Sequence, residues 1–188
     1  MDALVEAALR KWPNVPHCHG WLALDARGDW YMRDDRIQAA GPFPAVKGSA
    51  IRHDKLREFI HRNYLRDEVG AAYFQNGPQR VYVDLEAAPY VWRITRPSEG
   101  SRPLPVASTL TVTAHTGEPV TRVVDSWLDE QGRLFLRTTL GSVGEAFGVV
   151  HSQDMLDAAD AVEQGLWTPE PMPFADMPSR FGYVMRPH

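Results

Sequence analysis

The chain has 188 residues and a formal net charge of −4, which argues against nucleic acid as a partner because phosphate binding requires a basic surface. Its hydrophobic fraction of 44% is enough for a core, and its apolar runs are too short to span a membrane. Cys18 is the only cysteine, so an internal disulfide is impossible. Met1-Asp2 leads directly into a helical pattern without signal-peptide features. We therefore expect a cytoplasmic protein that binds neither membranes nor nucleic acid.

Hydrophobic spacing predicts a mixture of helices and short strands. Apolar residues recur at the helical period in some segments and alternate in others. The predicted helices cover residues 2–12, 54–65 and 152–164. The predicted strands cover residues 73–74, 80–85, 90–94, 109–113 and 120–124. Two β-hairpins are predicted at 20–34 and 123–138.

The two predicted hairpins share a sequence frame. Asp25-x-x-Gly28 and Asp129-x-x-Gly132 are each followed by a short apolar strand and an arginine. The glycine supplies the positive φ that such a turn needs. A unit that recurs about a hundred residues later indicates a repeated architecture, because one such unit cannot bury its apolar face alone. We therefore expect a repeated β-hairpin-plus-helix motif.

The proline-rich segment 96–105 is the best predicted linker of the chain. It divides the sequence into an N-terminal α+β subdomain, residues 1–97, and a β-rich C-terminal subdomain, residues 98–188. The fold class expected is α+β, with mostly antiparallel sheet and an extended C-terminal tail from 166 to 188. The tail is too aromatic for a disordered segment. We expect it to pack without regular structure, with Trp167, Phe174 and Phe181 largely buried.

The cluster His17-Cys18-His19 combines two imidazoles and a thiol. Adjacent ligands rarely close around one zinc ion, and neighbours on an extended chain point to opposite sides. A metal site would need help from His53 or His61. We favour a histidine pair beside a half-buried thiol, and we expect no bound metal. Among the other candidates, 141–144 lacks the Lys-Ser/Thr of a phosphate loop, so no cofactor is expected.

No pattern of catalytic residues is present in the sequence. Asp84 and Glu86 share one face of a predicted strand and are expected to be exposed polar positions. His53 is expected to be a helix cap or a surface group. Ser152, beside His151, is expected to be an N-cap and not a nucleophile. We therefore assign no catalytic residue.

Arg33 and Arg137 occupy matching positions in the two predicted hairpins. Each could pair with a carboxylate within its own subdomain, which is the favoured interpretation. Recognition of an anionic ligand is the alternative, because a guanidinium binds carboxylate and phosphate groups through two parallel hydrogen bonds. These two arginines are the candidate ligand-binding residues.

Several motifs between residues 20 and 94 resemble those of a known family. They are Asp25-x-x-Gly28-x-Trp30, Ile51-Arg52-x-x-x-Leu56-x-x-Phe59, Val81-x-Val83 and Ala88-Pro89-Tyr90-Val91. Together they resemble the bacterial family known as domain of unknown function 1285. The resemblance implies an α+β chain of two small domains with repeated hairpin-and-helix motifs. It also implies a role in signalling or ligand sensing and brings no catalytic residues.

These observations favour a non-enzymatic module that binds a small molecule or a protein and possesses a signalling or sensing role. Two other classes stay open. One is an enzyme with a site in a cleft between the subdomains, and the other is a docking subunit that uses its aromatic tail. A homodimer is compatible with all three.

Overall fold

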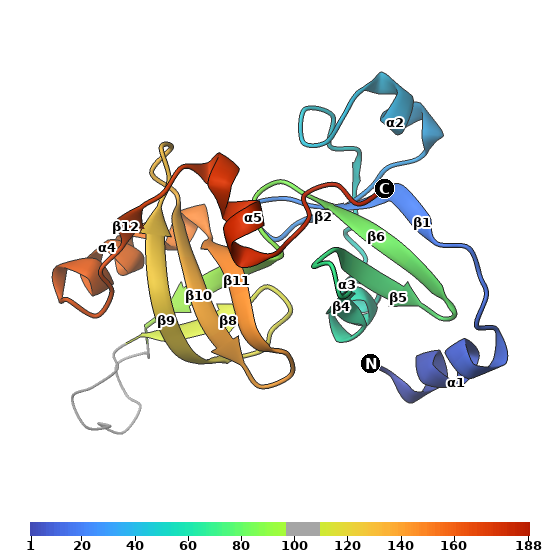
Figure 1. Ribbon diagram of the computed structural model, residues 1–188, viewed down its shortest axis with the longest axis horizontal. Coiled ribbons are helices and arrows are strands. Elements are labelled where there is room, and N and C mark those ends of the chain that lie inside the picture. The colour runs from blue at the N-terminus through green and yellow to red at the C-terminus, as the bar shows by residue number, and fades with distance from the viewer. Residues whose placement is uncertain (97–109) are drawn as a thin grey trace. The chain divides into compact units, whose positions relative to one another are not determined.

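The computed structural model describes residues 1–96 and 110–188, which form two compact units (Figure 1). Unit 1 comprises Met1–Ala88 and Pro178–His188, and unit 2 comprises Pro89–Met177. This division differs from the expected boundary between residues 97 and 98, because strand β7 (Tyr90–Thr95) pairs with two strands of unit 2. Most of the predicted linker, from 97 onward, lies outside the described residues. Within the described residues no helix is long and apolar enough to cross a membrane.

Unit 1 is built on a six-stranded sheet with the order β3-β2-β1-β6-β5-β4. Its strands are β1 (Cys18–Leu24), β2 (Trp30–Met32), β3 (Ser49–Ala50), β4 (Tyr64–Arg66), β5 (Ala72–Asn76) and β6 (Gln79–Leu85). Its helices before β6 are α1 (Ala3–Lys11), α2 (Asp35–Ala40) and α3 (Asp54–Arg62). β1 and β6 are parallel, and the other neighbours are antiparallel.

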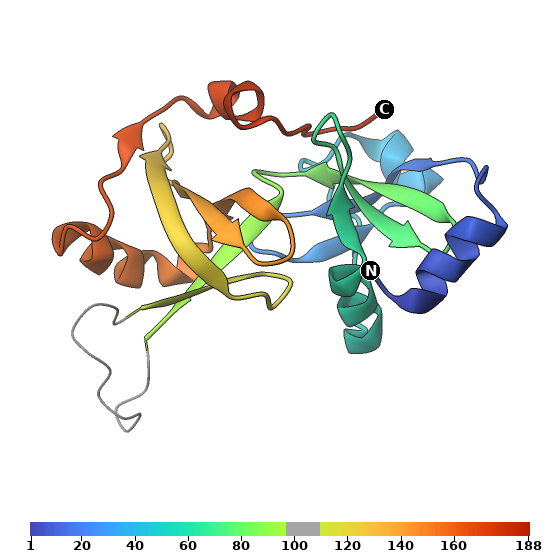
Figure 2. The same ribbon diagram turned by 60° about the horizontal axis from the view of Figure 1, so that its bottom comes forward.

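Helix α3 packs on this sheet (Figure 2). His53 caps its first turn by accepting the Leu56 N–H at Nδ1, so the prediction of a cap is confirmed. Phe59 meets Phe74 of β5 edge to face, with ring centroids 5.4 Å apart. The helix ends at Arg62, earlier than its apolar spacing predicts, because the next residues pair with β5 as strand β4.

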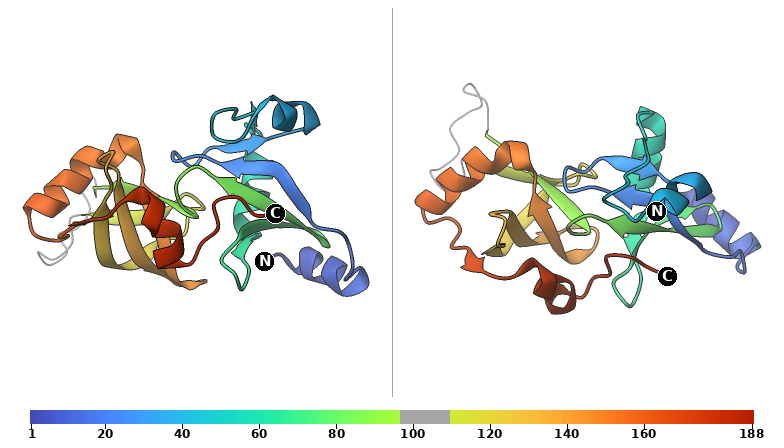
Figure 3. Two further views of the ribbon diagram at one scale, coloured as in Figure 1. Left: turned by 45° about the horizontal axis from the view of Figure 1, so that its top comes forward. Right: turned by 90° about the horizontal axis from the view of Figure 1, so that it is seen from above.

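Unit 2 contains a second six-stranded sheet, with the order β12-β9-β10-β11-β7-β8. After β7, its strands are β8 (Thr111–Ala114), β9 (Val120–Leu128), β10 (Leu134–Leu140), β11 (Gly144–Val150) and β12 (Glu170–Pro171). Its helical segments are η1 (Ser152–Asp154), α4 (Met155–Glu163) and η2 (Phe174–Asp176), and α5 (Met177–Phe181) begins at its end. The sheet curls so that an isolated bridge, Thr113 to Pro119, brings β8 against β9 (Figure 3).

Both sheets are mixed. The pairs β1–β6, β11–β7 and β12–β9 are parallel, and the other pairs between the named strands are antiparallel. The pairing therefore agrees with the expected mostly antiparallel sheet, although neither sheet is purely antiparallel. The α+β composition with two sheets is confirmed. In unit 2 the core centres on Trp92, whose indole N–H donates to the Leu136 carbonyl at 3.2 Å. Gly148 leaves room for this ring, because a Cβ there would lie 2.6 Å from the indole nitrogen.

The Asp-x-x-Gly frame forms the same turn in both predicted hairpins. In the first, Asp25 Oδ1 accepts two backbone N–H groups and the Gly28 N–H donates to the Asp25 carbonyl. Asp129 and Gly132 repeat these bonds in the second. A third copy, starting at Asp67 and unrecognised in the sequence, joins β4 to β5. The frame is therefore a turn signature that this chain uses more than twice.

The larger repeated unit is not confirmed. Helix α2 begins three residues after β2 ends, whereas strand β11 and η1 separate β10 from α4. The carboxylate of an Asp-x-x-Gly turn satisfies its own backbone N–H groups, so it needs no particular element to follow it. Turn chemistry explains the shared frame without a duplicated hairpin and helix.

The C-terminal tail contains short regular elements, which corrects the expectation of an irregular segment. Trp167, Phe174 and Phe181 are half-buried and not largely buried, and the buried residues of the tail are Met177, Tyr183 and Pro187. Phe174 carries the Arg133 guanidinium over its ring, at 4.3 Å, which lets it lie at the surface. The end of the chain runs beside β6, where the Leu85 N–H donates to the Met185 carbonyl at 2.8 Å (Figure 1).

Gly70 provides a test of this packing. Its φ is +86°, and a Cβ would collide with the Gly182 carbonyl of the C-terminal segment. Gly77 has a φ of +57° but open space around it. We expect Gly77→Ala to lower the free energy of unfolding by about 1 kcal/mol through backbone strain alone. Gly70→Ala should cost about 2 kcal/mol more because the segment must move.

Urea unfolding of the two glycine variants measures this difference. Limited proteolysis should also release the C-terminal segment faster from Gly70→Ala than from Gly77→Ala. Equal stabilities and equal cleavage rates would show that the segment does not pack closely on this turn.

Candidate ligand-binding face of strand β6

Strand β6 has one polar and one apolar face. Because strand side chains alternate, Arg80, Tyr82 and Asp84 point to one side and Val81, Val83 and Leu85 to the other. On the polar side, Tyr73 of β5 lies opposite Tyr82. We call the polar side, with Tyr73 and the groups that contact it, the β6 face.

The β6 face contains a buried ion pair. Arg33 Nη1 lies 3.3 Å from Asp84 Oδ2, and the two side chains are only 4% and 11% exposed. Arg33 also donates through Nη2 to the Gly41 carbonyl at 2.7 Å, while its buried Nε has no hydrogen-bond partner among the described residues. The sequence candidate Arg33 is therefore held by a carboxylate of its own unit, as the favoured interpretation expected.

Burial governs the chemistry of Asp84. Loss of solvent raises the pKa of this carboxyl above its ordinary value, against the opposing effects of Arg33, Arg186, His188 and His19. The expectation that Asp84 is exposed was wrong, because β6 is an inner strand and the C-terminal segment runs beside it. The guanidinium groups of Arg33 and Arg186 therefore act on one buried carboxylate.

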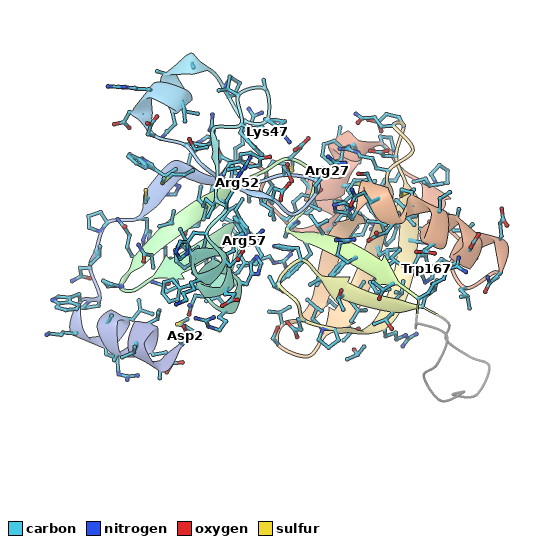
Figure 4. The ribbon with its side chains drawn as sticks, turned by 180° about the vertical axis from the view of Figure 1, so that it is seen from behind. Asp2, Arg27, Lys47, Arg52, Arg57 and Trp167 are labelled. Atoms are coloured by element: carbon cyan, nitrogen blue, oxygen red, sulfur yellow. The ribbon has the colours of Figure 1, made fainter. Side chains whose placement is uncertain are left out.

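Glu86, the second carboxylate of the predicted pair, belongs to a different network. It is half-buried and lies 3.1 Å from Lys47, which also contacts Asp25 at 2.9 Å. Lys47 is labelled in Figure 4. The Lys47 ammonium and two turn N–H groups hold the pKa of Asp25 below its ordinary value, although burial opposes them. Asp84 and Glu86 thus do not form a catalytic carboxylate pair.

Tyr82 organises the centre of the β6 face. The His19 ring stacks on it with centroids 4.5 Å apart, and His17 approaches it edge-on at 5.8 Å. Its hydroxyl donates to Asp67 Oδ2 at 3.1 Å. His19 Nδ1 is buried and has no hydrogen-bond partner in the described parts of the chain. The two imidazoles of the sequence cluster thus serve as aromatic neighbours of a tyrosine.

Cys18, between these histidines, is half-buried, and burial raises the pKa of its thiol. In residues 1–96 and 110–188, no three His, Cys, Asp or Glu side chains lie in positions to hold a metal ion. The expectation of no bound metal stays a prediction.

An open concavity of about 480 Å³ adjoins Tyr82. It is lined by Arg66, Asp67, Glu68, Val69, Tyr73 and Arg80. The Arg80 guanidinium lies over the Tyr73 ring at 4.7 Å. Hydrogen bonding to Tyr82 raises the pKa of Arg80, although partial desolvation opposes it more strongly than any other single contribution. Arg66 forms no ion pair with any described residue.

Arg66 and Arg80 were not recognised in the sequence. The two arginines are fourteen positions apart and meet only because β4 and β6 flank β5. The available signal was the alternation Arg80, Tyr82, Asp84, which places three chemically active side chains on one face.

The second sequence candidate, Arg137, lies on β10 in unit 2. It forms an ion pair with Asp125 across the strand pair, and Glu145 of β11 lies 3.6 Å away. All three side chains are at least one-third exposed. The structure does not bring Arg137 into the candidate site.

Two histidines outside the β6 face, His61 and His151, accept hydrogen bonds from a core side chain and from a backbone N–H. His151, not Ser152, caps η1 by accepting the Gln153 N–H at 3.1 Å, so the expected cap was one residue too late. His61 Nε2 accepts the Trp30 indole N–H at 2.9 Å. Burial, together with the nearby Arg57, lowers the pKa of His61 to about 4.

Solved structures of DUF1285 family proteins are similar to this chain. A DUF1285 family protein from Silicibacter pomeroyi DSS-3 matches with a TM-score of 0.51 and 16% identity, over 85% of this chain and 84% of that one. A DUF1285 family protein from Shewanella baltica OS155 gives a TM-score of 0.44 and 14% identity, over 74% and 91% of the two chains. The first match confirms the resemblance at the level of the fold.

The family itself is defined by sequence. The family model DUF2944, described as "Protein of unknown function (DUF2946)", matches residues 1–188. The chain belongs to this family. The search of curated proteins found no match.

Arg33 and Arg137 provide a matched test of burial. Arg33→Ala should lower the free energy of unfolding by about 3–5 kcal/mol, because it leaves Asp84 buried without its partner. Arg137→Ala should cost less than about 1 kcal/mol, since its ion pair is exposed. Denaturant unfolding measures both. The double variant Arg33→Met/Asp84→Leu should recover much of the loss; equal costs for the two alanine variants would contradict the buried pair.

His61 should make unit 1 sensitive to acid. Its folded pKa of about 4 lies below the ordinary value of 6.5, so the unfolded chain binds the proton between these two values. Stability is therefore full above pH 6.5 and falls as the pH drops toward 4. Allowing for partial exposure, we expect a loss of about 1–2 kcal/mol. Thermal melting from pH 7 to pH 4 should show a flatter profile for His61→Gln; parallel profiles would exclude His61 as the cause.

Proposed function

We propose that this chain is a non-enzymatic binding module and that unit 1 takes a small anionic molecule in the concavity of the β6 face. The observation that carries the proposal is one hollow lined by two arginines, Arg66 and Arg80, with the Arg80 guanidinium over the Tyr73 ring. A volume of about 480 Å³ lies in the range of small-molecule sites, roughly 300–1,000 Å³.

The charges of this concavity favour an anion. Asp67 is occupied, because Oδ1 accepts two turn N–H groups and Oδ2 accepts the Tyr82 hydroxyl. Glu68, the other lining carboxylate, is exposed. The guanidinium groups are therefore the polar groups best able to bind a carboxylate or phosphate, through two parallel hydrogen bonds each.

The site is partly preorganised. Contact with Tyr73 and Tyr82 restricts the Arg80 side chain before a ligand arrives, which reduces the entropy lost on binding. Arg33 supports the proposed site indirectly. It neutralises Asp84, which lies two positions after Tyr82 on β6. Arg137 is not part of it.

A sensing role extends this proposal. Val184 of the C-terminal segment packs against the cluster of Ala71, Tyr73 and Tyr82. A ligand that contacts Tyr73 would alter the packing of that cluster and hence the hold on the segment. We propose a cytoplasmic sensor whose output is the order of residues 178–188, acting alone or as a homodimer.

Calorimetric titration with inorganic phosphate and with citrate tests the site. We expect one of these probes to bind, and we expect Arg66→Ala and Arg80→Ala each to weaken it at least tenfold, as the loss of a charge-assisted hydrogen bond requires. Arg10→Ala, which removes an exposed arginine of α1, is the matched control and should bind normally.

Two results would contradict the proposal. One is no heat and no thermal stabilisation with either probe at millimolar concentration. The other is binding that Arg66→Ala and Arg80→Ala leave unchanged.

A further inference from the structure

The sheet of unit 2 curls toward closure but stays open along one seam. Strand β8 pairs with β7 on one edge, and its other edge meets β9 only at the bridge from Thr113 to Pro119. Strand β9 pairs with β10 throughout, while its outer edge is covered by β12 only at Trp127 and Leu128. Within the described residues, two strand edges therefore face each other without a ladder between them.

A groove of about 450 Å³ lies along this seam. It is lined by Leu110, Thr111 and Val112 at β8, by Val120, Thr121, Arg122 and Val123 of β9, and by Leu166 and Trp167. Figure 4 shows Trp167 at the side of unit 2, near the start of β8. Every lining residue lies in unit 2.

The groove offers three kinds of contact at once. Strand backbone N–H and C=O groups alternate between the two edges, so an open edge presents unpaired donors and acceptors. Leu166 is 48% exposed and Trp167 is half-buried, which provides apolar surface. Arg122 is exposed and forms no ion pair in the part of the chain that the structure describes.

We propose that this groove binds an extended peptide segment that carries a carboxylate side chain. The peptide adds a strand to β8 or β9, which uses the open edge. Its alternate apolar side chains contact Leu166 and Trp167, and its carboxylate pairs with Arg122. This site is separate from the anion site of unit 1, so either proposal can fail without the other.

Selection from a phage-displayed library of random 12-residue peptides tests the groove. We expect enrichment of sequences that alternate β-branched or aromatic residues and include Asp or Glu. A synthetic copy of the enriched peptide should bind at least tenfold more weakly to Arg122→Glu and to Trp167→Ala. Arg36→Glu, the same charge reversal on helix α2, should bind as the unmodified chain does.

Amide hydrogen exchange and N-methylation of the peptide test the proposed backbone hydrogen bonds separately from the side-chain contacts. Binding should slow amide hydrogen exchange at residues 111–112 or 120–123, and N-methylation of alternate peptide residues should abolish binding. The proposal is overturned if no sequence is enriched. It is also overturned if the enriched peptide binds Arg122→Glu and Trp167→Ala normally, or if N-methylation has no effect.

Discussion

The ion pair between Arg33 and Asp84 joins the end of β2 to the inner strand β6. A buried carboxylate loses its hydration, at a cost of several kcal/mol, so positive groups must stay beside it. Arg33 meets this need and at the same time fixes the following loop through the Gly41 carbonyl. Arg186 and His188 also act on Asp84, which gives the C-terminal segment an electrostatic reason to lie on this sheet. One charge on β6 thus constrains a strand end, a loop and the chain terminus.

The same strand carries the polar groups of the site proposed in unit 1. Its polar face continues from Asp84 through Tyr82 to Arg80, and each of these side chains has partners from another segment. At the buried end of this row, the Asp84 carboxylate has Arg33 as its ion-pair partner. At the open end Arg66 and Arg80 border a concavity, which is where we propose that an anion binds. The neighbouring tyrosines connect that open end to Val184, so the proposed ligand would act on the packing of the C-terminal segment.

Sequence periodicity was sufficient to predict the α+β class, helix α3 and the faces of β6, because these depend on local spacing. It could not predict the parallel pair β1–β6, which joins strands far apart in the chain. The shared Asp-x-x-Gly frame suggested a duplicated unit, yet Asp67 shows that the frame encodes a turn. Strand pairing alone brings Arg66 and Arg80 to one concavity, so sequence spacing could not predict them as a pair. Nothing in the sequence indicates that Asp84 is the carboxylate that holds Arg33. The boundary between the units lies between Ala88 and Pro89, earlier than expected, because β7 pairs with β11 of unit 2.

Side-chain NMR of the arginine Nε–H groups would test the binding site most directly. Each arginine gives its own signal, so the spectrum reports which guanidinium groups meet an added anion. Titration with phosphate or citrate should move the Arg66 and Arg80 signals together, with one saturation curve, and should leave the buried Arg33 signal nearly unchanged. Signals of Arg66 and Arg80 that stay fixed while those of other arginines move would show that the β6 face is not the site.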